Sequence, residues 1–185
     1  MDASGVRFGT SGARGLVADM TSEVCFAYTA AFLKAVSATS GRVALAMDLR
    51  PSSPSITAAC AAAIEHAGLN VDFCGTIPTP ALACYTQSQG FPGLMVTGSH
   101  IPFDRNGIKF YAATGEITKA DEASISRAVV SVPEAGHVLV LPEVNHSAYR
   151  NYIERHLQFF PPNCLAGMRL GFYQHSSVAP EHTSA

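Results

Sequence analysis

A serine near the middle of this 185-residue chain lies in the pattern best suited to chemistry. Ser99 follows the apolar run Leu94–Val96, which predicts a buried strand, and Pro102 prevents that strand from continuing. We therefore expect Ser99 on a loop held by the end of a strand, where reactive side chains are commonly found. A serine hydroxyl serves as a nucleophile or phosphate carrier only when proton acceptors and cations lie nearby. The side chains of this kind in the same stretch are His100, Arg105 and Lys109.

A serine hydrolase is the natural rival for such a hydroxyl, and the sequence argues against it. The Gly-x-Ser-x-Gly pattern fails because Thr97 and Ile101 stand where the outer glycines are required. His100 is also poorly placed as the base for Ser99, since adjacent residues on an extended chain point to opposite sides. A positioning role suits this histidine better.

The segment Phe8–Gly15 carries three glycines, two hydroxyl side chains and an arginine. Glycines let backbone amides turn towards an anion, and Arg14 can bind a phosphate through two parallel hydrogen bonds. The hydroxyl side chains are those of Thr10 and Ser11. Taken alone, this segment fits plain turn chemistry better than an anion site. The presence of the Ser99 loop in the same chain favours the interpretation as an anion site.

Four motifs stand out along the chain: Phe8–Gly15, Asp48–Ser53, Thr97–Pro102 and Asn106–Lys109. Together they resemble those of the α-D-phosphohexomutases, the phosphomannomutase and phosphoglucomutase family. They occur in the family's order and spacing, and the resemblance covers residues from about 5 through 175. The usual serine motif of the family reads Thr-Ala-Ser-His-Asn-Pro; here Gly98 replaces the alanine and Ile101 the asparagine.

The resemblance implies that Ser99 is carried as a phosphoserine. It would give its phosphoryl group to a mannose or glucose phosphate and take the other one back, so that phosphate moves between positions 1 and 6 of the sugar. An oxygen of the Ser99 phosphate would also be a ligand of Mg²⁺, a hard ion that prefers oxygen. Because a phosphoserine carries about −1.5 to −2 charges, cations within reach are required.

The same resemblance implies catalytic, phosphate-binding or supporting roles for further residues. Arg14 matches an arginine near the phosphoserine, and Lys109 matches a lysine placed for proton transfer or charge neutralisation. His100, the residue that follows the serine, is predicted with Ser99, Arg14 and Lys109 as a catalytic residue. Thr10 and Ser11 join Arg14 and Lys109 as the predicted phosphate-binding residues. Asp48 and Arg50 belong to a family motif, for which we expect a role in supporting the loops.

The family builds its active site from four domains, and three of its elements are not found in this sequence. These are an aspartate-rich metal loop, a sugar-selecting loop and a phosphate-clamping loop. We therefore expect a truncated N-terminal portion that is inactive alone, with the remaining Mg²⁺ ligands in the missing part of the second domain. Two alternatives are a sugar-phosphate or anion-binding module without turnover, and a fragment that depends on a partner chain.

Alternating strands and helices predict an α/β fold, a three-layer α/β/α sandwich with a mixed, mostly parallel sheet. The segment 108–111 follows the serine loop too closely for a helical crossover, so we expect it to run antiparallel. We expect Ser53 to be an N-cap with Pro54 at the first helical position. The expected strands span 42–48, 69–74, 93–96 and 108–111, and the expected helices span 22–36, 54–67, 80–87, 119–130 and 147–157.

The predicted organisation has three parts. Residues 1–135 form the phosphoserine domain, 136–167 form a connector, and 168–185 begin an incomplete second α/β unit. The run Arg169–Tyr173 is expected to be the first strand of that unit.

The composition limits the classes of partner and the location that we expect for the chain. A net charge of −2, with no basic run, gives no indication of a nucleic acid or of an anionic membrane. Five widely spaced cysteines without a Cys-x-x-Cys pair predict buried, reduced thiols. No leader peptide or apolar run of membrane-spanning length is found, so a cytoplasmic location is expected.

Overall fold

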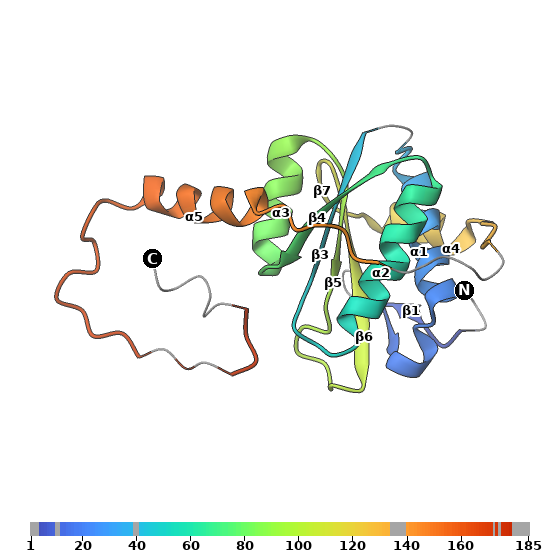
Figure 1. Ribbon diagram of the computed structural model, residues 1–185, viewed down its shortest axis with the longest axis horizontal. Coiled ribbons are helices and arrows are strands. Elements are labelled where there is room, and N and C mark those ends of the chain that lie inside the picture. The colour runs from blue at the N-terminus through green and yellow to red at the C-terminus, as the bar shows by residue number, and fades with distance from the viewer. Residues whose placement is uncertain are drawn as a thin grey trace.

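The computed structural model describes residues 4–9, 12–38, 41–133, 140–171, 173 and 175–178 (Figure 1). One mixed sheet lies between two layers of helices. Its strands are β1 (Arg7–Phe8), β2 (Gly12–Leu16), β3 (Arg42–Met47), β4 (Asn70–Thr76), β5 (Gly93–Val96), β6 (Arg105–Ala112) and β7 (Gly115–Glu116). The α-helices are α1 (Ser22–Ala35), α2 (Ser53–His66), α3 (Thr79–Gln89), α4 (Lys119–Arg127) and α5 (Ser147–Phe159), with a 3-10 turn at Val17–Asp19.

The predicted α/β class and mixed sheet are confirmed, but the prediction of mostly parallel pairing is wrong. The strand order is β1-β2-β6-β5-β3-β4, and β7 pairs with β6. Among the described strands only the β3–β4 and β3–β5 pairs are parallel; the pairs that involve β1, β2, β6 and β7 are antiparallel. The short loop after β5 forces β6 to return antiparallel, as expected, and the N-terminal hairpin then pairs with β6.

The two faces of the sheet are covered by different helices, which gives the predicted three layers (Figure 1). One core contains residues of α1, α2 and α4, and the other contains residues of α3 and α5. Alternate residues of β6 point to opposite faces: Ile108 and Phe110 lie in the first core, and Tyr111 lies in the second.

Helix boundaries fall close to the predicted ones, and one cap is corrected. Ser53 is the first residue of α2 rather than its N-cap, which is Ser52. The hydroxyl of Ser53 donates instead to Asp48. The last helix of the domain, α4, begins with a Thr118–Asp121 capping box and ends at Arg127, earlier than predicted.

A buried carboxylate attaches the segment before α5 to the edge strand β4. Asp72 is 4% exposed and accepts hydrogen bonds from the Tyr85 hydroxyl at 2.9 Å and from the Asn145 amide at 2.6 Å. The guanidinium of Arg42 lies 3.7 Å from the same carboxylate. The backbone N–H of Asn145 also donates to Phe73 O of β4. Burial, together with the bond to Asp72, raises the pKa of Tyr85 to about 12.

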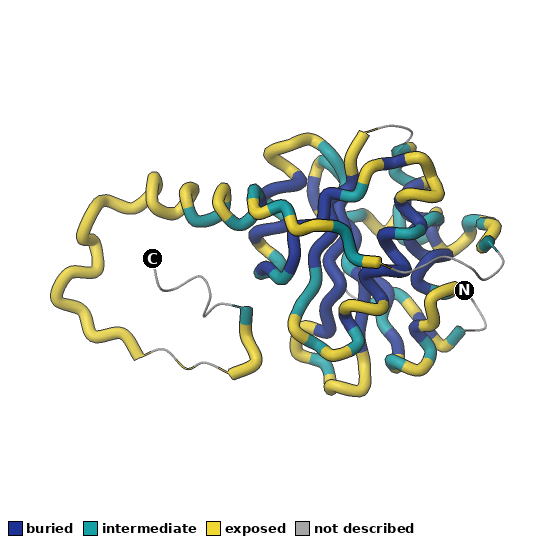
Figure 2. Tube along the Cα trace, viewed as in Figure 1, coloured by how far each residue is buried: buried dark blue, intermediate teal, exposed yellow. Residues whose placement is uncertain are grey.

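Beyond α5 the described residues lie at the surface, and the predicted strand at Arg169–Tyr173 is not formed among them (Figure 2). A strand needs a neighbour for its backbone groups, and the described sheet offers none there. The division into a domain, a connector and a second unit stays a prediction. Among the described helices, none is both long and apolar enough to cross a membrane.

The expectation of buried thiols holds for three cysteines and fails for two. Cys25, Cys60 and Cys74 are buried, whereas Cys84 is half-buried and Cys164 is exposed. Burial raises the pKa of Cys60 and of Cys74 to about 12, and it raises that of Cys25 as well. All five are unpaired.

Thiol reactivity should follow this division. At pH 8 Cys164 should react rapidly with a disulfide reagent such as Ellman's, while the three buried thiols stay inert because they are covered and remain protonated. Peptide mapping of the native chain measures this, and denaturant should release all five thiols. Rapid labelling of Cys60 in the native chain would contradict the described core.

Replacing Asn145 should loosen the attachment of α5. Asn145→Ala leaves the Asp72 carboxylate short of a donor and should lower the free energy of unfolding by about 1–3 kcal/mol. Chemical denaturation measures the loss, and amide exchange should rise first in α5. The matched control is Asn151→Ala on the exposed side of α5, whose stability should stay at or above that of the parent chain.

Candidate active site

Ser99 lies on an exposed turn that directly follows β5. The backbone N–H of Thr97 still donates to Gly107 O of β6, which fixes the start of the loop. The N–H of Ser99 then donates to the Thr97 hydroxyl at 2.9 Å, and that of Ile101 donates to Gly98 O at 3.0 Å. Ser99 has a φ of 51°, a left-handed conformation that is uncommon outside glycine. Such a conformation costs about 1–3 kcal/mol and persists only where the surroundings enforce it.

Asp48, just after β3, accepts hydrogen bonds from the Ser99 loop and from the start of α2. One carboxylate oxygen accepts from the Thr97 hydroxyl at 2.9 Å and from the Gly98 N–H at 3.1 Å. The other accepts from the Ser53 hydroxyl at 2.5 Å and from the Arg50 N–H at 3.0 Å. Because β3 and β5 are parallel neighbours, their carboxyl ends meet at one edge and place Asp48 beside Thr97.

Asn106 joins the start of α2 to the start of β6. Its side-chain amide donates to the hydroxyls of Ser52 at 2.9 Å and Ser53 at 3.0 Å, and its carbonyl oxygen accepts from the Gly107 N–H. Asn106 is fully buried. These contacts agree with the supporting role expected of the Asp48 motif. They also show what the sequence did not predict, namely that Thr97 and Asn106 belong to the same framework.

Arg14 lies at the base of the Ser99 loop. It pairs with Gly107 across β2 and β6, and it is half-buried. A Cβ atom on Gly107 would lie 3.0 Å from Arg14 Cγ and 3.3 Å from Thr97 O, so the arginine stem passes beside the first residue of the loop. A larger residue at position 107 would therefore move the Arg14 side chain away from Thr97, the first residue of the loop.

Lys109 stands on the same face of the sheet as Arg14. It is two residues beyond Gly107 on β6, and side chains two apart on a strand share a face. It pairs with Gly12 on one side and with Met95 on the other, and it is half-buried. The strand register therefore brings two of the predicted cationic groups to one face, next to the strand from which the loop emerges.

The glycine-rich segment is an antiparallel hairpin of β1 and β2 rather than one continuous loop. Gly12 is required for packing, since a Cβ atom there would overlap the backbone of β6 at Ile108 and Lys109. Thr10 and Ser11, the two predicted phosphate-binding hydroxyl residues, lie outside the described residues. His100 is described and is exposed beside Ser99.

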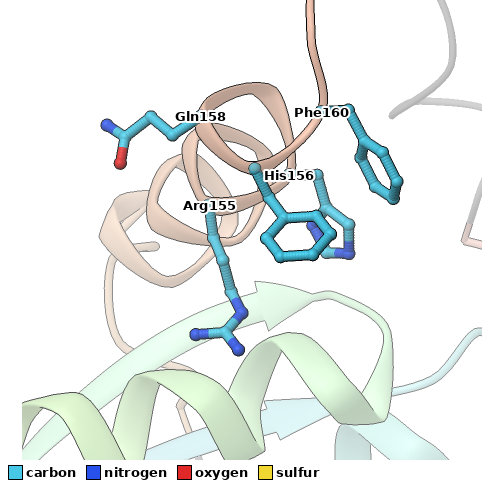
Figure 3. Close-up of a pocket in the computed structure, with 5 residues that line it drawn as sticks. Arg155, His156, Gln158 and Phe160 are labelled. Atoms are coloured by element: carbon cyan, nitrogen blue, oxygen red, sulfur yellow. The ribbon is translucent and has the colours of Figure 1, made fainter. Parts of the chain in front are cut away.

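The arrangement is an exposed hydroxyl on a rigid loop with two cations on the adjoining sheet face. Such a combination suits a phosphoryl group, because the hydroxyl is accessible and fixed positive charge can offset the phosphate. A separate hollow at the end of α5 is lined by other residues, including Arg155, His156 and Phe160 (Figure 3). None of the predicted site residues that the structure describes lines it.

Comparison with known proteins decides the family. Residues 5–135 match the family model of the phosphoglucomutase/phosphomannomutase α/β/α domain I. The chain belongs to the phosphoglucomutase/phosphomannomutase family. The α/β/α fold predicted from the alternating strands and helices is that of this family's first domain.

Relatives of this chain are named phosphomannomutase or phosphoglucosamine mutase. A phosphomannomutase of Salmonella muenchen is 48% identical over 96% of the chain, and one of Sinorhizobium fredii is 43% identical over 95%. A phosphoglucosamine mutase of Glaesserella parasuis is 34% identical over 83% of the chain. The chain spans 36–39% of the length of these relatives.

A solved structure shows the same fold. The crystal structure of a Thermus thermophilus protein assigned as a phosphomannomutase superimposes with a TM-score of 0.74 at 26% identity. The superposition covers 89% of this chain and 38% of the Thermus protein.

Removing the Asp48 carboxylate should destabilise the domain. Asp48→Ala leaves the donors of Ser53, Thr97 and Gly98 without their acceptor, and we expect a loss of about 2–4 kcal/mol in the free energy of unfolding. Urea titration measures it. The control is Asp104→Ala, an exposed carboxylate on the same loop, which should change stability by less than about 0.5 kcal/mol. Equal effects of the two variants would contradict the role of Asp48.

Proposed function

We propose that this chain is the phosphoserine-bearing portion of a phosphohexomutase that moves a phosphoryl group between positions 1 and 6 of a hexose phosphate. The observation that carries the proposal is the exposed hydroxyl of Ser99 on a loop held by Asp48 and Asn106, within the segment that matches the family's first domain. Mannose phosphate is the preferred substrate, because the relatives at 48% and 43% identity are named phosphomannomutases.

The proposed transfer runs in two balanced steps. A free sugar hydroxyl forms a bond to phosphorus as the bond from phosphorus to Ser99 Oγ breaks; the sugar hydroxyl gives up its proton and Ser99 Oγ takes one up. The resulting sugar bisphosphate then returns its other phosphoryl group to Ser99, with the proton movements reversed. Arg14 and Lys109 offset the phosphate charge, and Lys109 is the candidate for moving a proton.

Mg²⁺ would neutralise charge on the transferring phosphoryl group when bound. The exposed position of Ser99 leaves room for the phosphate oxygen that would be its ligand. Within the described residues no three His, Cys, Asp or Glu side chains gather into a metal site. The remaining ligands would therefore come from another part of the enzyme.

Turnover is proposed to require more protein than this chain. The chain spans 37% and 39% of the two phosphomannomutase relatives. Large apolar side chains also stand exposed at and beyond the end of α5, which favours packing against further protein. They are Leu157, Phe159, Phe160, Leu165, Met168, Leu170 and Tyr173. A reducing, cytoplasmic setting is proposed from the five unpaired cysteines.

Phosphate transfer to Ser99 tests the function. The chain is incubated with a hexose 1,6-bisphosphate and Mg²⁺, alone and joined to the portion of the Salmonella muenchen relative that it does not cover. In the joined protein we expect phosphate on Ser99 by peptide mass spectrometry, and a loss of at least roughly 100-fold in mutase turnover for Ser99→Ala. Arg14→Ala and Lys109→Ala should each slow turnover by about 10- to 1000-fold.

The matched control is Ser126→Ala, which removes an exposed serine on α4 and should leave labelling unchanged. Phosphate recovered on a residue other than Ser99 would contradict the assignment of the carrier. Mutase turnover that persists in Ser99→Ala would do the same.

A further inference from the structure

The guanidinium of Arg50 lies inside the Ser99 loop and binds its backbone from within. One terminal nitrogen donates to Pro102 O at 2.7 Å and to Arg105 O at 3.0 Å. The other donates to Ile101 O at 2.6 Å and to Ser99 O at 3.3 Å. The four acceptors span the loop from its exposed serine to the first residue of β6.

The remaining nitrogen of the guanidinium forms an ion pair with a carboxylate. Arg50 Nε lies 3.5 Å from Asp48 Oδ2, and the Arg50 side chain is only 16% exposed. An arginine has five N–H donors in a fixed fork, and here four of them donate to backbone carbonyls while Nε lies beside a carboxylate. A lysine has three donors on one nitrogen and cannot reach this set of carbonyls.

Gly98 creates the space that Arg50 occupies. A Cβ atom built on Gly98 would overlap the guanidinium carbon and Nε of Arg50. Alanine at position 98 therefore requires Arg50 to move away from the loop. Gly98 is one of the two positions, with Ile101, at which this chain departs from the Thr-Ala-Ser-His-Asn-Pro form of the serine motif.

The same loop holds Ser99 in its left-handed conformation. The carbonyl of Ser99 is one of the four that Arg50 binds, and the Ser99 N–H is held by the Thr97 hydroxyl. Both peptide groups that flank the serine side chain are therefore restrained, one by Arg50 and the other by the Asp48–Thr97 pair. Loss of Arg50 frees the carbonyl side.

We propose that Arg50 is a positioning residue for Ser99, and that Gly98 is needed because it gives the Arg50 guanidinium access to the loop. Arg50 acts through the backbone and keeps the hydroxyl in one presented orientation before phosphate arrives. Its importance for catalysis rests on the proposed function, whereas its control of the loop conformation does not. Preorganised placement of a reacting group is the physical basis of the expected rate effect.

The loop conformation is tested on the isotopically labelled chain without any ligand. A residue at positive φ gives a strong intraresidue NOE between its amide and α protons. We expect this NOE for Ser99 in the parent chain and its weakening in Arg50→Ala, Arg50→Lys and Gly98→Ala. Amide exchange at Ile101 should rise by roughly tenfold or more in all three, because charge-assisted hydrogen bonds are lost. Arg105→Ala, which removes an exposed side chain at the first position of β6 and leaves the backbone carbonyl bound by Arg50, is the control and should change neither quantity.

A double-variant cycle tests the dependence of Arg50 on Gly98. If Gly98→Ala acts by displacing the guanidinium, it should add little to the exchange of Arg50→Ala, so the two effects are far from additive. Additive effects would overturn the proposed link between the two residues. The amide spectrum outside the loop shows which variants keep the fold. If Arg50→Ala does not fold, Gly98→Ala and Arg50→Lys still test the proposal.

The catalytic consequence is measured in the enzyme made by joining this chain to the portion of the Salmonella muenchen relative that it does not cover. We expect Arg50→Lys to lower kcat by about 10-fold or more with a smaller change in KM, because misplacement of the hydroxyl affects the transfer step. A kcat in Arg50→Lys equal to that of the parent enzyme would show that positive charge alone suffices, and it would overturn the positioning role.

The failures of the two proposals are distinguishable. An unchanged Ser99 NOE and unchanged Ile101 exchange in folded Arg50→Lys and Gly98→Ala would overturn the inference even if Ser99 carries phosphate. Phosphate on another residue would overturn the proposed function, while the ligand-free measurements would still decide the role of Arg50.

Discussion

The acceptance of four hydrogen bonds by the Asp48 carboxylate is the interaction on which the geometry of Ser99 depends. Its donors come from the residues after β3, the first residue of α2 and the residues after β5. A single carboxylate thus joins three segments that are separated by up to fifty residues in the chain. The parallel pairing of β3 and β5 makes this possible, because it brings their carboxyl ends to one edge of the sheet.

The periodic elements of this fold are predictable because their signals are local. The apolar stripe of α2 and the short apolar run of β5 give boundaries within one or two residues of the observed ones. The balance of parallel and antiparallel pairing was not predictable in the same way. It depends on the antiparallel pairing of the N-terminal hairpin with β6. The glycines of that hairpin did not distinguish an anion-binding loop from close strand packing.

The site was predictable in its residue types and less so in its contacts. The serine motif indicates a loop nucleophile, and the motif that contains Asp48 indicates a support. The sequence does not show that Asn106 reaches Ser52 and Ser53, since these contacts join residues more than fifty positions apart. It also predicted a strand at Arg169–Tyr173 from local composition, although a strand requires a neighbour that the described sheet does not provide.

The backbone conformation at position 99 also limits which residue can carry out the proposed chemistry. Threonine offers the same hydroxyl, but its second substituent on Cβ makes the left-handed region much less accessible. A threonine here would either strain the turn or pull the chain into an extended conformation and redirect its oxygen. The shape of the turn, and not the reactivity of the oxygen alone, therefore favours serine over its closest chemical equivalent.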